Sequence, residues 1–158
     1  MALLNAIQLL NELERMEQIR SCGGDQRKIE MFGMCYTKHE DITANGLTKA
    51  VIRWIELHGG AADRINTQGT FVKGKTVGVG MYGIKHLPGK YIPSGSTKGH
   101  ADITATINGK TWHIEIKIGR DKQSDAQKKF QAKQEAAGAK YSIVRSFDDF
   151  IAKWEGIR

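Results

Sequence analysis

The sequence predicts a mixed α/β domain, with a mixed central sheet flanked by helices. Apolar residues recur at helical spacing in several separate segments. An Asn-Gly pair lies between two alternating runs, which is the pattern of a β-hairpin. A helical segment follows this hairpin and precedes another short apolar strand. The chain has 158 residues and no linker divides it, so we expect a single domain over residues 1–158.

Residues 1–42 are expected to form an N-terminal helical extension. A helix is predicted from residue 2 to about residue 20, because apolar side chains recur at helical spacing: Leu3, Ile7, Leu10, Leu13 and Met16. This stripe favours a helix that caps the core, and a dimerisation helix is the alternative. Residues 21–41 give no clear assignment. Acidic residues interrupt the N-terminal apolar run and no stretch reaches membrane-spanning length, so the sequence predicts neither a signal peptide nor a membrane helix.

A second helix is predicted over residues 43–58. Thr43 is a suitable N-cap, and Gly59-Gly60 is a suitable end. The apolar stripe between them consists of Leu47, Ala50, Val51, Trp54 and Ile55. A short strand is expected to follow at residues 61–66.

Residues 67–99 have a different composition from the rest of the chain. They contain eight glycines and five lysines, and no acidic residue occurs between Asp63 and Asp102. We expect mostly a long loop, with some strand near residues 77–82. A glycine-rich, lysine-bearing loop can approach a phosphate backbone closely, which makes Lys73, Lys75 and Lys98 candidate nucleic-acid contacts. The alternative is a mobile surface loop without a role.

The Asn108-Gly109 pair predicts a β-hairpin with strands at residues 101–107 and 110–118. A two-residue turn of this type requires positive φ at both positions, and it fixes the register. Ile103 then faces Ile114, and the next pair is Asp102 with Glu115. Because side chains alternate along a strand, one face carries the apolar residues. These are Ile103, Ala105, Ile107, Trp112, Ile114 and Ile116.

The other face of the hairpin brings Asp102, Glu115 and Lys117 together. Two carboxylates at paired positions repel by roughly 3 kcal/mol, at about 5 Å and an effective dielectric of about 20. Lys117 offsets part of this repulsion, and a Mg²⁺ ion would offset more. The carbonyl of Ile116 is a further candidate ligand. His100 would pair with Lys117 in the same register, which makes His100 a candidate contact for a nucleic-acid substrate. The alternative is a structural salt bridge on a solvated sheet face.

The C-terminal part predicts three further elements. A helix is expected from Ser124 to Ala137, ended by Gly138, and a strand at residues 141–144 follows it. A last helix starts after Ser146.

The chain carries a strong basic excess. Its 24 lysines and arginines against 17 acidic residues give a net charge of +7, which favours a polyanionic partner such as nucleic acid. A basic but uninvolved surface is the alternative. The two cysteines, Cys22 and Cys35, lack zinc-ligand spacing.

The segments Gly99-His100-Ala101-Asp102 and Glu115-Ile116-Lys117 resemble the signature of the PD-(D/E)xK nucleases, with Ala101 in the usual proline position. The later Gly119-Arg120, the run from Ser124 to Gln127 and the run from Ala137 to Ala139 resemble the VRR-NUC branch, small phage and bacterial nucleases related to Holliday-junction resolvases. Arg64-Ile65-Asn66 also fits, and the resemblance covers about residues 43–150.

This resemblance implies a restriction-endonuclease-like core with the element order αβββαβ over residues 43–150. It implies catalytic roles for Asp102, Glu115 and Lys117 and an assisting role for Gln127. A capping box with Ser124 is the structural interpretation of Gln127. It further implies Mg²⁺ or Mn²⁺ as cofactor and a cytoplasmic protein of a bacterial or phage-infected cell.

The implied activity is an endonuclease that hydrolyses phosphodiester bonds of DNA, and branched, flap or junction DNA is the substrate by family analogy. RNA stays open as a substrate, and a homodimer stays open because a junction needs two cuts. Arg64, Arg120 and Lys128 join the candidate nucleic-acid contacts. The family usually has an acidic residue in its first core helix, where this chain has Asn45, with Glu40 before the helix and Glu56 near its end. This difference favours a first alternative, a DNA-binding module that cuts poorly. A protein-interaction domain whose basic charge is incidental is the second alternative.

Overall fold

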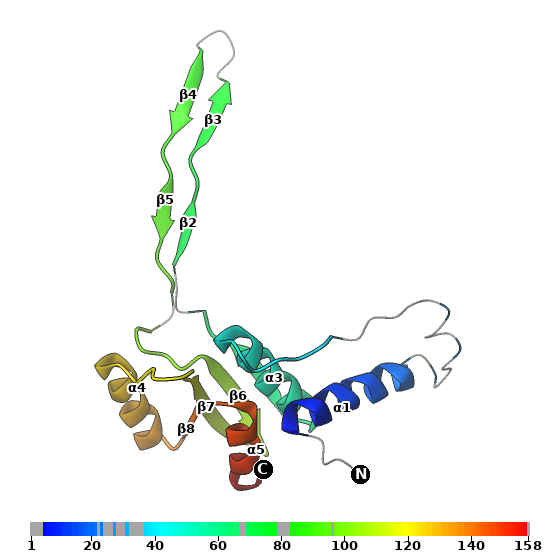
Figure 1. Ribbon diagram of the computed structural model, residues 1–158. Helices are drawn as coiled ribbons and strands as arrows, with labels where there is room; N and C mark the ends of the chain where they lie inside the picture. The colour runs from blue at the N-terminus through cyan, green and yellow to red at the C-terminus, as the bar shows by residue number, and fades with distance from the viewer. Residues whose placement is uncertain are drawn as a thin grey trace.

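A four-stranded mixed sheet forms the centre of the protein (Figure 1). The computed structural model describes residues 5–21, 23, 27, 31, 37–66, 69–78, 83–95 and 97–157. The strands are β1 (Ala61–Arg64), β6 (Ile103–Ile107), β7 (Lys110–Ile116) and β8 (Lys140–Val144), in the order β1-β6-β7-β8. β7 and β8 are parallel, and the other pairs are antiparallel. The predicted mixed sheet is confirmed.

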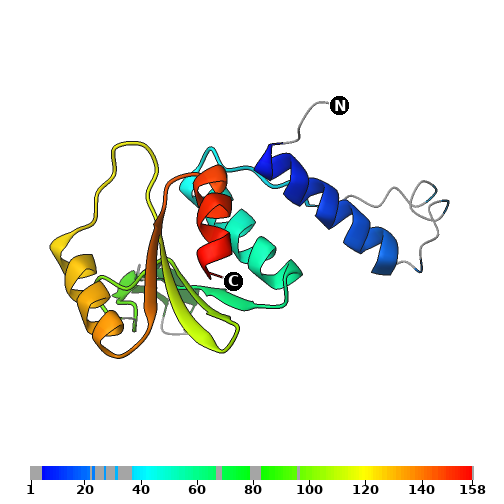
Figure 2. The same cartoon turned by 90° about the horizontal axis from the view of Figure 1, so that it is seen from below.

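Helices cover both faces of this sheet (Figure 2). They are α1 (Ala6–Ser21), α3 (Ala44–Leu57), α4 (Asp125–Ala136) and α5 (Phe147–Ile157). α3 and α5 lie on one face with α1 against them, and α4 lies on the other. The order α3-β1-β6-β7-α4-β8 follows the αβββαβ pattern, with an insertion between β1 and β6. Within the described residues, no helix combines the length and the apolar character needed to cross a membrane.

The core lies between the sheet and helices α3 and α5. The predicted apolar face of the hairpin is buried there, together with the stripe of α3 and the aromatic residues of α5. Thr43 caps α3 by accepting the N–H of Gly46, and Gly59 follows the helix with a φ of 82°. Both ends of α3 therefore follow the sequence signals that predicted them.

Helix α1 packs onto α3 and α5, as the capping interpretation predicts. Leu10 is fully buried, and the carboxylate of Glu14 accepts hydrogen bonds from the Arg53 guanidinium of α3. Met16, predicted to belong to the buried stripe, is 56% exposed. Leu3 lies outside the described residues.

The β6–β7 hairpin has the register that the sequence predicted. Ile103 pairs with Ile114, and Ile107 pairs with Lys110 across the turn. Asn108 and Gly109 have φ values of 50° and 71°. Asparagine tolerates this left-handed conformation and glycine adopts it without a Cβ penalty, so the turn forms where the sequence placed it.

The insertion between β1 and β6 is a projecting β-ribbon (Figure 1). The expectation of a long loop over residues 67–99 missed this pairing, although several of the described residues in this range lie outside strands. β2 (Thr70–Val72) pairs with β5 (Lys90–Ile92), and β3 (Lys75–Gly78) pairs with β4 (Ile84–Leu87), both antiparallel. These four strands and the described residues that join them, 70–78 and 83–92, are called the ribbon below. Cross-strand pairing satisfies backbone groups that a glycine-rich loop would leave to water. Of the predicted strand at residues 77–82, only 77 and 78 fall in β3, and 79–82 lie outside the described residues.

Candidate active site

Asp102 and Glu115 lie on the sheet face that α4 covers. Asp102 immediately precedes β6, and its Oδ2 accepts the backbone N–H of Ile116 at 2.8 Å. Glu115, in β7, is only 1% exposed. Asp102 and Glu115 lie one position beyond the last backbone pair of the hairpin, Ile103 with Ile114. They are close enough for the charge of Asp102 to raise the pKa of Glu115. Glu115 and Lys117 are buried rather than solvated, while the alternative of a structural salt bridge stays open, since the two side chains form an ion pair.

Three side chains contact the Glu115 carboxylate. The Nζ of Lys117 lies 3.0 Å from Oε1, and the side-chain amide of Gln127 also donates to Oε1. The hydroxyl of Tyr141 in β8 donates to Oε2 at 3.3 Å. A carboxylate removed from water needs such donors, since an unsatisfied buried charge is strongly destabilising.

Lys117 bridges two carboxylates. Its Nζ lies 3.2 Å from Oδ2 of Asp121, in the segment between β7 and α4, in addition to the contact with Glu115. Burial lowers the pKa of the Lys117 ammonium, but its hydrogen bonds to Glu115 and Asp121 outweigh this effect and raise the pKa overall. The same contact lowers the pKa of the Asp121 carboxyl. Lys117 is therefore held as a cation at neutral pH.

The electrostatic environment of Glu115 opposes its negative charge. Burial raises the pKa of the Glu115 carboxyl, the nearby Asp102 raises it further, and Lys117 opposes this shift only in part. Burial and the neighbouring Glu115 likewise raise the pKa of the Tyr141 hydroxyl, which stays protonated and able to donate. Burial and the charge of Asp102 together therefore oppose the ionised form of Glu115, and Lys117 favours it.

The donor set suits a hard divalent cation. Two carboxylates, those of Asp102 and Glu115, belong to the site, and Mg²⁺ is often held by one or two carboxylates with waters and substrate phosphate completing the shell. Among the described residues, no group of three or more His, Cys, Asp or Glu side chains is placed to hold a metal ion. The role of the Ile116 carbonyl as a ligand stays a prediction.

Gln127 forms the predicted capping box and also contacts the Glu115 carboxylate. Its side-chain Oε1 accepts the backbone N–H of Ser124 at 2.8 Å. Its backbone N–H donates to Oγ of Ser124, which completes the capping box. Its Nε2 donates to Glu115. One amide thus caps α4 and fixes the buried carboxylate, while its catalytic role stays a prediction.

The ring of His100 contacts other side chains than the predicted Lys117. Its ring packs against Phe130 of α4, with centroids 4.4 Å apart, and edge-on against His113 at 5.5 Å. The predicted pairing with Lys117 is not formed because the β6–β7 ladder begins at Ile103. Burial and the neighbouring His100 lower the pKa of His113.

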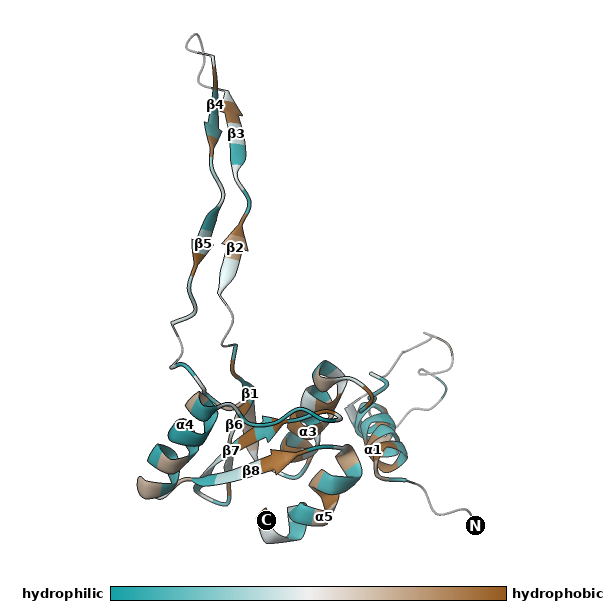
Figure 3. Cartoon of the chain, turned by 60° about the vertical axis from the view of Figure 1, so that its left-hand side comes forward, coloured by the Kyte–Doolittle hydropathy of each residue, from teal (hydrophilic) through white to brown (hydrophobic). Residues whose placement is uncertain are grey.

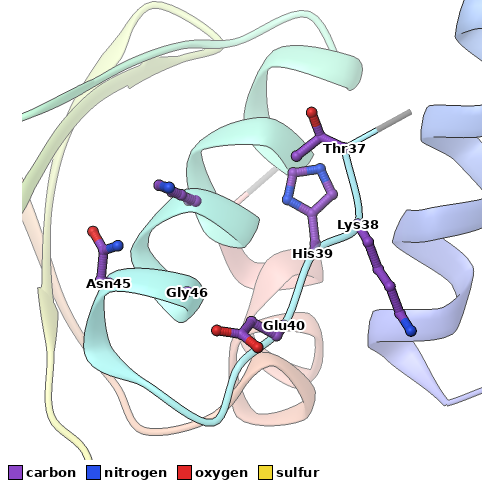
Figure 4. A pocket seen from close by; sticks show the side chains of 7 residues that line it. Thr37, Lys38, His39, Glu40, Asn45 and Gly46 are labelled. Atoms are coloured by element: carbon purple, nitrogen blue, oxygen red, sulfur yellow. The ribbon is translucent and has the colours of Figure 1, made fainter. Parts of the chain in front are cut away.

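A small pocket lies at the N-terminal turn of α3, where the resemblance implies an acidic residue. Its volume is about 140 Å³, and both Glu40 and Asn45 line it (Figure 4). Arg64 of β1 donates a hydrogen bond to Asn45. Glu56 lies near the other end of α3 and forms an ion pair with Arg53 at 3.4 Å. Of the two acids considered from the sequence, Glu40 is thus the one near the first turn.

The predicted phosphate contacts are distributed over several surfaces. All of them are exposed: Arg64 in β1, Lys73 and Lys75 on the ribbon, Lys98 before His100, Arg120 after β7, and Lys128 in α4. Lys128 forms an ion pair with Asp125 at 3.3 Å. The ribbon lysines lie on a projection from the sheet, so these residues do not form one patch with the α4 residues (Figure 1).

Sequence reasoning missed Tyr141 and Asp121. Asp121 follows Lys117 by four residues and belongs to no regular element, so spacing gave no reason to select it. Tyr141 reaches Glu115 only because β8 lies parallel to β7, with Tyr141 beside His113. No residue near Tyr141 in the sequence indicates this contact.

Comparison with protein-family models finds no match to this chain, and comparison with curated proteins finds none either.

Proposed function

We propose that this protein is a metal-dependent nuclease that hydrolyses phosphodiester bonds of DNA. The observation that carries the proposal is the buried Glu115 carboxylate, which shares its site with the Asp102 carboxylate and has a single ammonium, that of Lys117, in contact with it. The αβββαβ order of the restriction-endonuclease-like core, implied by the resemblance, agrees with this proposal.

The charge balance of the site favours a divalent cation held by Asp102 and Glu115. Asp102 and Glu115 share one ammonium, that of Lys117. Asp121, which Lys117 also contacts, is exposed and has Arg145 nearby as a second cation. When bound, Mg²⁺ or Mn²⁺ supplies Lewis-acid polarisation of the phosphate and lowers the pKa of a bound water.

The residues of the chain have separate roles in this proposal. Lys117 supplies positive charge to the phosphate in the transition state, since its ammonium is preorganised by Glu115. Gln127 and Tyr141 orient the Glu115 carboxylate through its two oxygens. Asp102 is held by the Ile116 N–H at the same end of the hairpin. Preorganised groups of this kind need no rearrangement during the reaction.

A DNA-binding module that cuts poorly is the second candidate. It is favoured by Asn45, which stands near the place where the resemblance implies an acid and is hydrogen-bonded to Arg64. A neutral amide there would weaken a second metal site, while the basic surface would still bind DNA.

Cleavage of labelled duplex, flap and four-way-junction DNA by the full chain tests the proposal. We expect cutting with Mg²⁺ or Mn²⁺, none with EDTA, and none by Glu115→Ala. Asp63→Asn, which neutralises an exposed carboxylate on β1, is the matched control and should cut normally. Salt-sensitive binding by folded protein without cutting of any substrate would favour the second candidate. Neither binding nor cutting would favour a protein-interaction domain.

A further inference from the structure

The ribbon exposes cationic and apolar side chains together and has no acidic residue. Its lysines are Lys73, Lys75, Lys85 and Lys90, and the whole segment between Asp63 and Asp102 lacks Asp and Glu. Phe71 is 63% exposed, Tyr91 59% and Ile84 70%. Figure 3 shows hydrophilic and hydrophobic residues intermixed along both sides of the ribbon. A free surface of this composition indicates a partner that is anionic and also has flat or apolar parts.

The cross-strand register places lysines beside aliphatic side chains. Val72 pairs with Lys90, Lys75 with Leu87, and Val77 with Lys85. Paired residues lie on the same face of a β-ribbon, so each pair presents one ammonium and one apolar group in the same direction. Phosphate contact and contact with sugars or base edges can thus be made side by side.

Lysines and apolar side chains also lie together around a hollow in the middle of the ribbon. It has a volume of about 190 Å³ and lies where β2 and β3 meet β4 and β5. Three lysines line it, Lys73, Lys75 and Lys90, with Val72, Leu87 and Pro88. The lining is mostly apolar, so the aliphatic parts of the lysines contribute to it beside the apolar side chains, and no carboxylate lines it.

The ribbon is held in shape by aromatic rings that cover glycines. A Cβ at Gly89 would lie 2.5 Å from the ring of Phe71, and a Cβ at Gly69 would lie 2.2 Å from the hydroxyl of Tyr91. Phe71 and Tyr91 are themselves a cross-strand pair. Each ring therefore lies over the glycine diagonal to it, which supports a ribbon that has no other layer packed on it.

We propose that the ribbon binds in the major groove of double-stranded DNA. The inference rests on the proposed function and names duplex DNA as its substrate. The major groove of B-DNA, about 12 Å wide, admits a two-stranded β-ribbon. One side of the ribbon, residues 70–78, spans roughly 30 Å at about 3.3 Å per residue, close to the length of one DNA turn of about 34 Å.

Two other partners fit the ribbon less well. A second copy of this chain paired through the ribbon would bring lysines against lysines with no acid to balance them, and like charges across strands are destabilising. Double-stranded RNA has a deep and narrow major groove that side chains do not enter. The test below distinguishes both of these partners from duplex DNA.

Binding of a short fluorescent duplex by the full chain in EDTA tests the proposal without requiring cleavage. The variant K75Q/K90Q removes two ribbon charges. The variant K110Q/K140Q removes two exposed charges at the first residues of β7 and β8. We expect K75Q/K90Q to weaken binding and to reduce the loss of affinity between about 50 and about 200 mM salt by about tenfold, since each phosphate contact contributes about 0.9 to the salt slope. K75R/K90R should bind like the parent chain, and so should K110Q/K140Q.

Several results would overturn the proposal. Equal affinity and equal salt slope for K75Q/K90Q and K110Q/K140Q would do so, as would equal binding of duplex RNA and duplex DNA. A change of oligomeric state in K75Q/K90Q on sedimentation, with DNA binding unchanged, would assign the ribbon to a second copy. Ribbon-dependent binding with no cutting in Mg²⁺ would instead leave this proposal standing and remove the nuclease.

Discussion

Gln127 and Glu115 are joined by a hydrogen bond that links the N-terminus of α4 to the middle of the sheet. The Nε2 of Gln127 donates to Glu115, while its Oε1 accepts the N–H of Ser124. The position of α4 over the sheet and the orientation of the buried carboxylate therefore depend on the same amide. A substitution there affects helix capping and the candidate active site together.

Gln127→Ala is expected to destabilise the protein by about 2 to 4 kcal/mol. About 1 kcal/mol comes from the lost cap, and the remainder comes from a buried carboxylate that loses a donor. Ser124→Ala removes the other half of the capping box and leaves the contact with Glu115, so it should cost only about 1 kcal/mol. Urea unfolding of the three proteins measures both differences. Equal losses in the two variants would mean that the Gln127–Glu115 contact contributes nothing to stability.

Mn²⁺ is expected to stabilise the folded chain through Asp102 and Glu115. A ligand that binds only the native state adds about 2.7 kcal/mol when its concentration is about 100 times its Kd. Asp102→Asn and Glu115→Gln should each abolish the rise in Tm with added Mn²⁺, because each removes one of the two carboxylate ligands. Asp63→Asn should keep it. A rise that persists in both site variants would place the metal elsewhere, whether or not the chain cuts DNA.

The carboxylate pair was predictable because its geometry follows from a local signal. Asn108-Gly109 accepts the positive φ values of the turn, and the turn then sets the cross-strand pairs back to Ile103 and Ile114, which are next to Asp102 and Glu115 in the sequence. The capping box of Ser124 and Gln127 is local in the same sense. Signals within a few residues therefore gave half of the site and most of the helix boundaries.

The contact of Tyr141 with Glu115 was not predictable, because it depends on a parallel register. β8 reaches β7 only after the α4 crossover, and no residue near Tyr141 specifies which β7 residue it meets. The ribbon was missed for another reason. Its strands are exposed on both faces, so the alternation of apolar and polar residues that identifies a half-buried strand is absent.

Gly89→Ala is expected to disorder the base of the ribbon without changing the stability of the core. A Cβ there would meet the Phe71 ring, which must then leave its place over the glycine. Amide hydrogen exchange should become faster in β2 and β5, while the Tm of the domain should stay the same because no core residue belongs to the ribbon.

A second substitution tests the mechanism of that effect. Phe71→Ala in the Gly89→Ala background removes the clash, so the double variant should exchange no faster than Phe71→Ala alone. Gly95→Ala is the control, since a Cβ at that position meets nothing within 4 Å. Additive effects of the two substitutions would show that the ring and the glycine do not interact.

His39 is expected to make the protein less stable in mild acid. Its side chain is buried, and burial lowers its pKa, with Arg53 and Lys49 lowering it further and Glu14 opposing them. The unfolded chain therefore takes up this proton near the ordinary pKa of 6.5, while the folded chain takes it up only at lower pH. The stability contribution is complete above pH 6.5 and is lost as the pH falls through the folded pKa.

His39→Gln should flatten this dependence, because glutamine does not titrate. The free energy of unfolding, measured in urea between about pH 8 and about pH 5, should fall less in the variant than in the parent chain. Some decline should remain, since the pKa of His113 is lowered in the same sense. His86→Gln, at an exposed ribbon position, should behave like the parent chain. An unchanged slope in His39→Gln would mean that α1 and α3 accommodate a protonated His39 beside Glu14 at no cost.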